Sequence, residues 1–489
     1  GGTIMIRFEN VSFSYAGNAQ EGLEPVDLTI EDGECILLCG RSGCGKTTFT
    51  RLINGLIPNF YPGKLNGRVT VNGLVISETP MYQIAGQVGS VFQNPRTQFF
   101  NTDTDSEIAF GIENAALPLS ELHQRVAQAE KDLNIENLSG RSIFELSGGE
   151  KQKIAFASVY AMNPNVYLLD EPSSNLDMDA IDELKETLRL LKQQGKTILV
   201  AEHRLYYLMD VIDRAFYFER GRLEKVYSPD ELLALSQEDR ERMGLRATDL
   251  HTVEPVYPQV RNDKAALELK NLSLSYKKQK ILEDLTISVK AGEVVGIIGH
   301  NGAGKTTFSR AVCGLHKEIE GKIFLNNTEQ SRKDLMKRSY LVMQDVNYEL
   351  FAESVEQESI FGIKNPDKEL AKATLEELDL AQFSQWHPNT LSGGQKQRLA
   401  VAVSMICRKD LLVFDEPTSG LDFDNMLRVA QLINRLAQMG KIVFVATHDY
   451  EFVCRACNRI LHLDDNRLVS SYQLCTENEV QLRSLFAVT

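Results

Sequence analysis

Long apolar runs are missing from this 489-residue sequence, and so is any excess of positive charge. No apolar stretch approaches the roughly 18 residues that a membrane-spanning helix needs. Acidic residues number 67 against 53 basic ones, giving a formal charge of −14, which disfavours nucleic-acid binding and adsorption to an anionic membrane. No secretory signal peptide is recognised, and we expect the natural chain to start at or near Met5.

Cysteine is scarce as well, because eight cysteines are too few for a disulfide scaffold in a chain of this length. Cys454 and Cys457 form a C-x-x-C pair, which is open to interpretation as redox or metal chemistry. No second pair with zinc spacing accompanies it. We therefore expect both residues to be small buried side chains on one helix after His448.

The sequence does contain an internal repeat, whose period is half its length. Four motifs recur in order, at residues 40–48 and 299–307, 146–150 and 391–395, 168–172 and 413–417, and at His203 and His448. Lys46 and Lys305 lie 259 positions apart, whereas Asp170 and Asp415 lie 245 apart. The difference of 14 positions arises before the second motif, in regions that we expect to be surface connections.

The repeat predicts a domain at residues 5–227 and a second domain at residues 266–489. Residues 228–265 join them. Ser228 can cap a helix whose first turn suits Pro229. The rest of the joining segment is expected to be an extended linker.

Two periodicities predict strands alternating with helices in each half. Residues 35–39 are continuously apolar, as expected for a central parallel strand that is covered on both faces. Apolar residues at helical spacing mark residues 122–133 and 181–191, and Gly195 ends the second segment. This alternation predicts a parallel α/β core in each half.

The strongest local signal is the loop Gly-x-x-x-x-Gly-Lys-Thr, which is present in both halves. Its glycines allow backbone N–H groups to surround phosphate oxygens, and the next helix presents its positive N-terminal end. The lysine reaches the β and γ phosphates, and the threonine offers a hydroxyl to Mg²⁺. The predicted nucleotide-binding residues are Gly40, Arg41, Ser42, Gly43, Cys44, Gly45, Lys46, Thr47 and Thr48, and Gly299, His300, Asn301, Gly302, Ala303, Gly304, Lys305, Thr306 and Thr307.

An aspartate and a glutamate end a later apolar run in each half. Asp170 and Asp415 are expected at the C-terminal tip of a strand, where α/β sheets bind ligands, and can hold Mg²⁺ through water. Side chains alternate along a strand, so Glu171 and Glu416 can point towards an attacking water instead. A carboxylate in that place orients or deprotonates the nucleophile.

With these motifs in order twice, the sequence resembles the ATP-binding cassette (ABC) ATPases over almost its whole length. The resemblance implies two α/β domains of P-loop type, each with a RecA-like parallel-sheet core, an antiparallel β subdomain and a helical subdomain. It implies hydrolysis of ATP with Mg²⁺. The implied roles are adenine stacking for Tyr15 and Tyr276, metal contact and γ-phosphate sensing for Gln93 and Gln344, γ-phosphate contact for His203 and His448, catalysis by Glu171 and Glu416, and metal binding by Thr47, Asp170, Thr306 and Asp415.

The resemblance also gives a reason for two copies. In this family the Leu-Ser-Gly-Gly turn caps the nucleotide bound by the opposite half, so Ser147, Gly148 and Gly149 are expected at the second nucleotide. Ser392, Gly393 and Gly394 are likewise expected at the first. The plain alternative is a helix cap with no ligand. The implied arrangement is two composite sites within one chain, both hydrolysing ATP, with unequal rates left open.

The resemblance extends to a subtype. The aromatic and apolar residues at 93–100 and 344–351, with Glu202-His203-Arg204, are similar to the fused ATPases of energy-coupling factor (ECF) transporters, which import vitamins and transition-metal ions. This implies a transmembrane scaffold subunit, a solute-binding membrane subunit, and a peripheral place at the cytoplasmic face of the cell membrane. Nucleic acid is not an expected partner.

Two other functions remain in view. Soluble tandem ABC ATPases that act on ribosomes or nucleic acid share the motif order, but they need a long charged joiner, basic extensions or a cysteine-rich module, none of which is recognised here. A non-hydrolysing regulatory dimer is disfavoured because Glu171 and Glu416 are intact.

Overall fold

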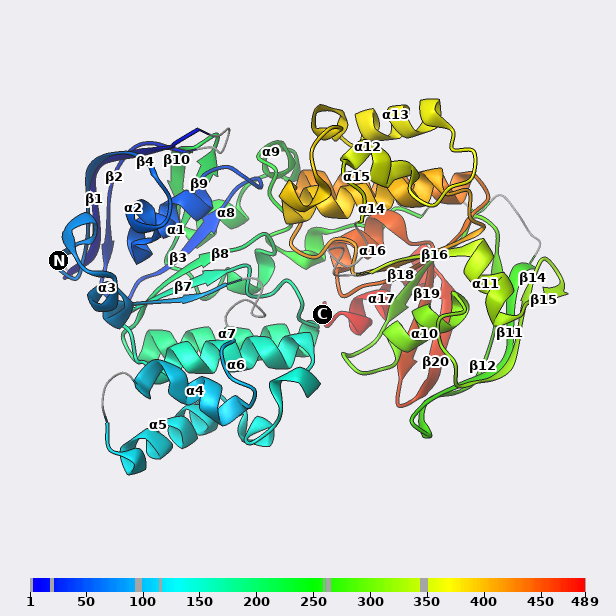
Figure 1. Cartoon of the computed structure of the whole chain (residues 1–489), viewed down its shortest axis with the longest axis horizontal. Coiled ribbons are helices and arrows are strands. Elements are labelled where there is room, and N and C mark those ends of the chain that lie inside the picture. The colour runs from blue at the N-terminus through cyan, green and yellow to red at the C-terminus, as the bar shows by residue number, and fades with distance from the viewer. Residues whose placement is uncertain are drawn as a thin grey trace. The chain divides into compact units, whose positions relative to one another are not determined.

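The structure is a computed structural model that describes residues 3–17, 22–92, 99–113, 117–257, 260, 265–343 and 351–488. The chain divides into two compact units, Gly1–Asp249 and Leu250–Thr489, which Figure 1 colours from blue to green and from green to red. Within the described ranges, no helix has both the length and the apolar character needed to cross a bilayer.

Unit 1 contains an antiparallel sheet and a mostly parallel sheet. The first has the order β2-β1-β4-β5 and is formed by β1 (Ile4–Tyr15), β2 (Leu23–Glu31), β4 (Gly63–Val71) and β5 (Leu74–Val75). The second has the order β10-β9-β3-β8-β7-β6 and is formed by β3 (Cys35–Cys39), β6 (Val88–Val91), β7 (Val166–Asp170), β8 (Thr197–Ala201), β9 (Arg214–Glu219) and β10 (Arg222–Tyr227). Its pairings are parallel except for that of edge strand β10 with β9.

The central strand β3 is buried on both faces, as its continuous apolar run predicts. Ile36 and Leu38 pack in a core that includes α1 (Lys46–Asn54) and the antiparallel sheet. Cys35 and Leu37 face the opposite core, which includes α7 (Met178–Gln193). Period-two alternation thus places α1 and α7 on opposite faces of the sheet.

A third core in unit 1 belongs to a helical subdomain. Helices α4 (Thr104–Glu113), α5 (Leu119–Asp132) and α6 (Gly148–Ala161) enclose Ile108, Val126 and Ile154, and Figure 1 shows them grouped on the α7 side of the sheet. Two short helices, α2 (Leu56–Asn59) and α3 (Met81–Gln87), complete the other side.

Unit 2 repeats these parts as a single ten-stranded sheet of order β15-β14-β11-β12-β20-β19-β13-β18-β17-β16. The strands are β11 (Ala265–Tyr276), β12 (Gln279–Lys290), β13 (Val294–Ile298), β14 (Ile319–Leu325), β15 (Thr328–Glu329), β16 (Ser339–Val342), β17 (Leu411–Asp415), β18 (Ile442–Ala446), β19 (Arg459–Asp464) and β20 (Arg467–Gln473). The helices are α10 (Lys305–Val312), α11 (Arg332–Arg338), α12 (Val355–Ile360), α13 (Lys368–Glu377), α14 (Gly393–Ile406), α15 (Phe423–Gln438), α16 (Tyr450–Ala456) and α17 (Glu479–Leu485).

The repeat holds at the level of single hydrogen bonds. The amide of Glu24 donates to the carbonyl of Gly221 at 2.7 Å, and that of Glu283 donates to Asn466 at 2.8 Å. These donors lie 259 positions apart and the acceptors 245, the two offsets of the sequence. The fold is therefore two α/β domains in tandem, each with a parallel core, an antiparallel part and a helical part, as predicted.

The joining segment differs from the prediction in one respect. Helix α8 (Pro229–Leu233) begins with a capping box from Ser228, as expected. Residues 237–242 do not form an extended linker, because they fold into a second helix, α9 (Gln237–Arg242), and Leu245 packs in the core of unit 1 that includes α7. Apolar residues at isolated positions gave no periodic signal for this packing.

Candidate nucleotide site

The glycine loop of unit 1 adopts a conformation that side chains would obstruct. Gly40 has φ of 139°, and a Cβ atom there would lie 2.3 Å from the carbonyl oxygen of Phe218. Gly45 has φ of 109° and is the residue before α1, which begins at Lys46 without a side-chain cap. Gly299 would meet Leu463 in the same way, at 2.3 Å. Both loops fit the phosphate-binding role predicted for their glycines.

Each loop folds around its own lysine. The buried Lys46 ammonium donates to the carbonyls of Gly40 at 2.8 Å and Arg41 at 2.9 Å. Lys305 is buried as well and donates to the carbonyls of Gly299 and His300. The lysine that is predicted to bind phosphate is therefore held inside its own loop in both units.

The strand-end aspartates lie beside these lysines. Burial raises the pKa of Asp170, the negative charge of Glu171 raises it further, and the charge of Lys46 opposes both. Burial raises the pKa of Asp415 to about 6, against the opposing effects of Lys305 and of a hydrogen bond from Thr306.

The predicted metal pair of unit 2, Thr306 and Asp415, thus lies together at the end of β17. A hydroxyl and a carboxylate are oxygen donors, the ligand type that Mg²⁺ requires. In unit 1 the exposed Thr47 follows Lys46, and Asp170 ends β7.

A glutamate and a histidine form a close pair in each unit. His203 Nε2 lies 3.2 Å from Glu171 Oε1, and His448 Nε2 lies 3.3 Å from Glu416 Oε1. Both glutamates take left-handed backbone conformations, with φ of 45° and 48°. Such strain in a non-glycine residue persists only where surrounding contacts impose it, and it clusters at functional sites.

A backbone hydrogen bond to a neighbouring strand stabilises each of these strained conformations. The amide of Glu171 donates to the carbonyl of Ala201 at 2.8 Å, and that of Glu416 donates to Ala446 at 2.8 Å. The acceptors lie in β8 and β18, the strands that lead to the two histidines. The sequence offered no sign of the left-handed turn, because a glutamate before proline is ordinarily extended.

The Leu-Ser-Gly-Gly turns begin helices in both units. Ser147 caps α6 and Ser392 caps α14, each through a capping box with the residue three positions later. Both serines and the following Gly148 and Gly393 are exposed. Both serines thus cap their helices, and the N–H groups of the two exposed glycines lie at the surface.

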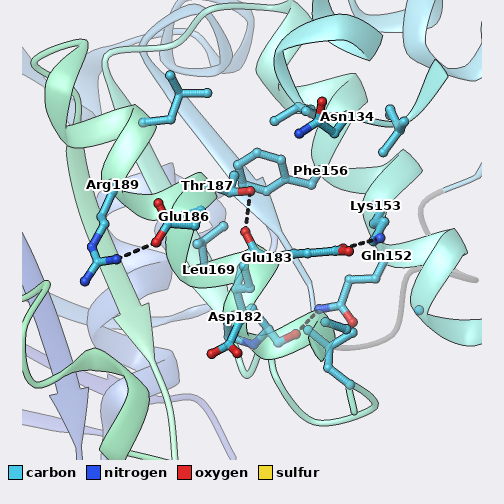
Figure 2. A pocket seen from close by; sticks show the side chains of 18 of the residues that line it. Asn134, Gln152, Lys153, Phe156, Leu169, Asp182, Glu183, Glu186, Thr187 and Arg189 are labelled. Carbon is cyan, nitrogen blue, oxygen red and sulfur yellow. Dashed lines mark hydrogen bonds and ion pairs between the residues drawn. The ribbon is translucent and has the colours of Figure 1, made fainter. Parts of the chain in front are cut away.

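A cavity of about 570 Å³ lies behind the first of these turns, between α6 and α7 (Figure 2). Gly149 and Leu176 line it, and Gln152 donates to the carbonyl of Pro172 at 2.6 Å. Lys153 and Glu183 pair from the two helices. None of its described lining residues belongs to the glycine loop, so we assign the cavity no part in phosphate binding.

The adenine-stacking candidates differ in their surroundings. The hydroxyl of Tyr15 lies 2.8 Å from Thr48 Oγ1 and accepts from Arg51 at 3.0 Å, whereas Tyr276 is 58% exposed. Gln93 and Gln344 lie outside the described residues.

The cysteine pair of unit 2 is buried. Cys454 lies in α16 and Cys457 directly after it. Burial raises the pKa of the Cys454 thiol to about 12. Both residues are small buried side chains at one helix, as predicted.

Comparisons with known proteins agree with this geometry. A family model described as ABC transporter matches residues 23–174 and 282–419. A predicted ABC transporter ATP-binding protein of Treponema denticola is 47% identical over 484 residues, which are 98% of this chain and 99% of that protein. A protein of the same description from Methanosarcina mazei is 33% identical over 512 residues, covering 94% of this chain and 87% of its own.

Among solved structures, a chain in a model of ribosome-bound archaeal Pelota and ABCE1 is similar over 97% of this chain and 80% of its own length. Its TM-score is 0.72 and its sequence identity 21%, so the likeness bears on the fold alone. The family match and the relatives together identify this chain as a member of the ABC transporter family, an ATPase with two ABC domains in tandem.

Proposed function

We propose that this chain is the energy-coupling ATPase of a membrane transporter, and that the transporter is an ECF-type importer of a vitamin or a transition-metal ion. Its partners are then a transmembrane scaffold subunit and a solute-binding membrane subunit. The chain would act at the cytoplasmic face of the membrane. The ATPase family of the chain and the names of its relatives support the transport class.

The observation that best supports coupling to a membrane subunit is a pair of exposed aromatic residues that recurs at equivalent positions of the two units. Phe100 and Phe110 stack with ring centroids 4.9 Å apart, and Phe351 and Phe361 lie 6.5 Å apart. All four rings are exposed. Exposed aromatic residues that recur at equivalent positions indicate a protein interface.

A buried glutamate binds the backbone at the first ring of each aromatic pair. Glu107 Oε2 accepts from the amides of Phe100 at 3.0 Å and Asn101 at 2.8 Å. Glu358 Oε2 accepts from the amides of Phe351 at 2.8 Å and Ala352 at 2.6 Å. These hydrogen bonds hold the backbone at Phe100 and Phe351 in place, which lowers the entropy lost on binding.

The catalytic proposal assigns two composite sites. Lys46, Glu171 and His203 act with the Ser392 turn, and Lys305, Glu416 and His448 act with the Ser147 turn. In each, the lysine and the loop N–H groups bind the phosphates, the glutamate orients or deprotonates the attacking water, and the histidine contacts the γ-phosphate. Mg²⁺, when bound, neutralises charge on the phosphates.

Closure of the two halves on ATP would then drive the scaffold. Moving an equilibrium from mostly open to mostly closed takes about 5.5 kcal/mol of differential binding. Two polyphosphates gripped by charge-assisted hydrogen bonds from both halves are a suitable source of that free energy.

The test is purification from the native membrane with identification of the associated proteins by mass spectrometry. We expect two membrane proteins with the wild-type chain, and a loss of about 30-fold in their recovery with F110A and F361A combined, the equivalent of about 2 kcal/mol. Y82A and V480A, which also remove exposed apolar side chains, serve as controls. Recovery of ribosomes in place of membrane proteins would favour the soluble alternative.

A further inference from the structure

Each histidine turn contains a buried carboxylate, but its position in the sequence relative to the histidine differs between the two units. Unit 1 reads Glu202-His203-Arg204 and unit 2 reads Thr447-His448-Asp449, so the acid precedes one histidine and follows the other. Glu202 and Asp449 are each 3% exposed. Burying a carboxylate is costly unless hydrogen bonds compensate, so each must have a defined set of donors.

Both carboxylates bond to the same position of the fold. Glu202 Oε2 accepts from the amide of Ser173 at 3.3 Å, and Asp449 Oδ2 accepts from the hydroxyl of Thr418 at 2.7 Å. Ser173 and Thr418 lie 245 positions apart and two residues after the strained glutamates. Each acid therefore joins the histidine turn to the segment that carries Glu171 or Glu416.

Each carboxylate also holds its own turn. Glu202 Oε1 accepts from the amides of His203 at 3.1 Å and Arg204 at 3.4 Å. Asp449 Oδ1 accepts from the amide of Phe452 at 3.2 Å, while its own amide donates to Thr447 Oγ1 at 3.0 Å. Different atoms thus restrain the same turn in the two units.

A further residue near the acid also differs between the two units. Tyr207 donates its hydroxyl to Glu202 Oε2 at 2.7 Å. The equivalent residue of unit 2, 245 positions later, is Phe452, which has no hydroxyl. The buried tyrosine accompanies the acid that needs a further donor, and phenylalanine accompanies the acid that bonds to Thr418.

We propose that Glu202 and Asp449 are positioning residues, which fix His203 and His448 against the catalytic glutamates, and that each works only with its own set. One set is Glu202, Arg204 and Tyr207, and the other is Thr447, Asp449 and Phe452. This inference rests on the proposed catalytic function of the two glutamate–histidine pairs.

The test uses the full chain with E416Q, so that turnover reports on the Glu171–His203 pair. Turnover of this background checks the proposed catalytic function separately. Added to it, E202T is expected to lower kcat by about 10- to 100-fold while KM for ATP changes less than about 3-fold, because a displaced histidine impairs the chemical step. The exchange E202T/R204D/Y207F installs the second set and is expected to restore kcat to within about 3-fold.

A second variant guards against misfolding of E202T. E202Q keeps the shape of the side chain but sets an amide against the Ser173 N–H and Tyr207, so we expect a folded protein with lowered kcat and little change in KM. Unaltered kcat in both single variants would overturn the proposal. So would failure of the triple exchange to recover activity while its thermal unfolding and ATP-analogue binding match those of the background.

Discussion

His203 lies directly against Glu171 in unit 1, with Nε2 of the histidine 3.2 Å from Oε1 of the glutamate. The pair recurs in unit 2 at 3.3 Å, and the same left-handed backbone at the glutamate recurs with it. Two copies of a strained arrangement, 245 residues apart, indicate that the geometry serves a purpose common to both units.

Replacement of the glutamates one at a time separates the two sites. We expect E171Q and E416Q each to lower steady-state ATP hydrolysis, and the double variant to lower it by about 10²- to 10⁴-fold, the usual contribution of a general base. ATP binding should persist, since the loops are intact. If either single replacement leaves turnover unchanged, that site is not catalytic.

One substitution can separate the capping role that the serine turns have in the structure from the phosphate contact that we propose for them. S147D should keep the α6 cap, because aspartate caps as well as serine, but it places a negative charge where a γ-phosphate is proposed. We expect thermal stability to stay near that of the wild type and ATP hydrolysis to fall at least about 10-fold. S147A should instead cost about 1 kcal/mol of stability.

Ser228 provides the matched control for the two substitutions of Ser147, since it caps α8 through the same type of capping box. S228D should leave hydrolysis and stability nearly unchanged. Equal hydrolysis by S147D and S228D would contradict a phosphate contact at Ser147.

A substitution at Gly40 tests whether the backbone of the glycine loop binds phosphate. In G40A, a methyl group meets the Phe218 carbonyl oxygen at 2.3 Å and φ of 139° is strained, so we expect loss of ATP binding and a cost of about 1–3 kcal/mol. G195A, at φ of 74° with open space around it, isolates the conformational strain alone. Isothermal titration with an ATP analogue and thermal unfolding measure both effects, and unchanged binding by G40A would contradict the assignment.

Glu130 gives unit 1 a pH-dependent stability. Burial raises its pKa from 4.5 to about 7, and the charge of Asp105 adds to the effect. The folded state therefore holds this proton more tightly than the unfolded state, and the contribution of Glu130 to stability falls as pH rises from about 4.5 through 7.

The variant E130Q removes this titration. We expect it to exceed the wild type in stability by about 1–2 kcal/mol at pH 8, with the difference vanishing below the unfolded pKa. E121Q, on the same helix but exposed, is the control. Thermal unfolding at both ends of the pH range measures the difference, and a constant difference across pH would contradict the assignment.

Much of the fold was predictable because local patterns dictate it. The apolar run at residues 35–39 predicted a strand covered on both faces, and the glycines that follow it predicted a loop whose backbone N–H groups can surround phosphate oxygens. The two offsets predicted a repeated fold with variable connections, which the bonds of Glu24 and Glu283 reproduce.

Other features depend on distant contacts that no local pattern encodes. Leu245 is buried because the core of unit 1 that includes α7 offers a surface for it. The left-handed Glu171 depends on an acceptor in β8, and the exchange of Glu202 for Asp449 has meaning only once Ser173 and Thr418 are known to lie beside them.

The central claim is that each half completes the nucleotide site of the other. A crystal structure of the E171Q/E416Q chain with Mg²⁺ and ATP tests it directly. The account predicts that the Ser392 turn contacts the nucleotide bound at Lys46, and that the Ser147 turn contacts the one bound at Lys305. Two bound nucleotides with both serine turns facing solvent would contradict it.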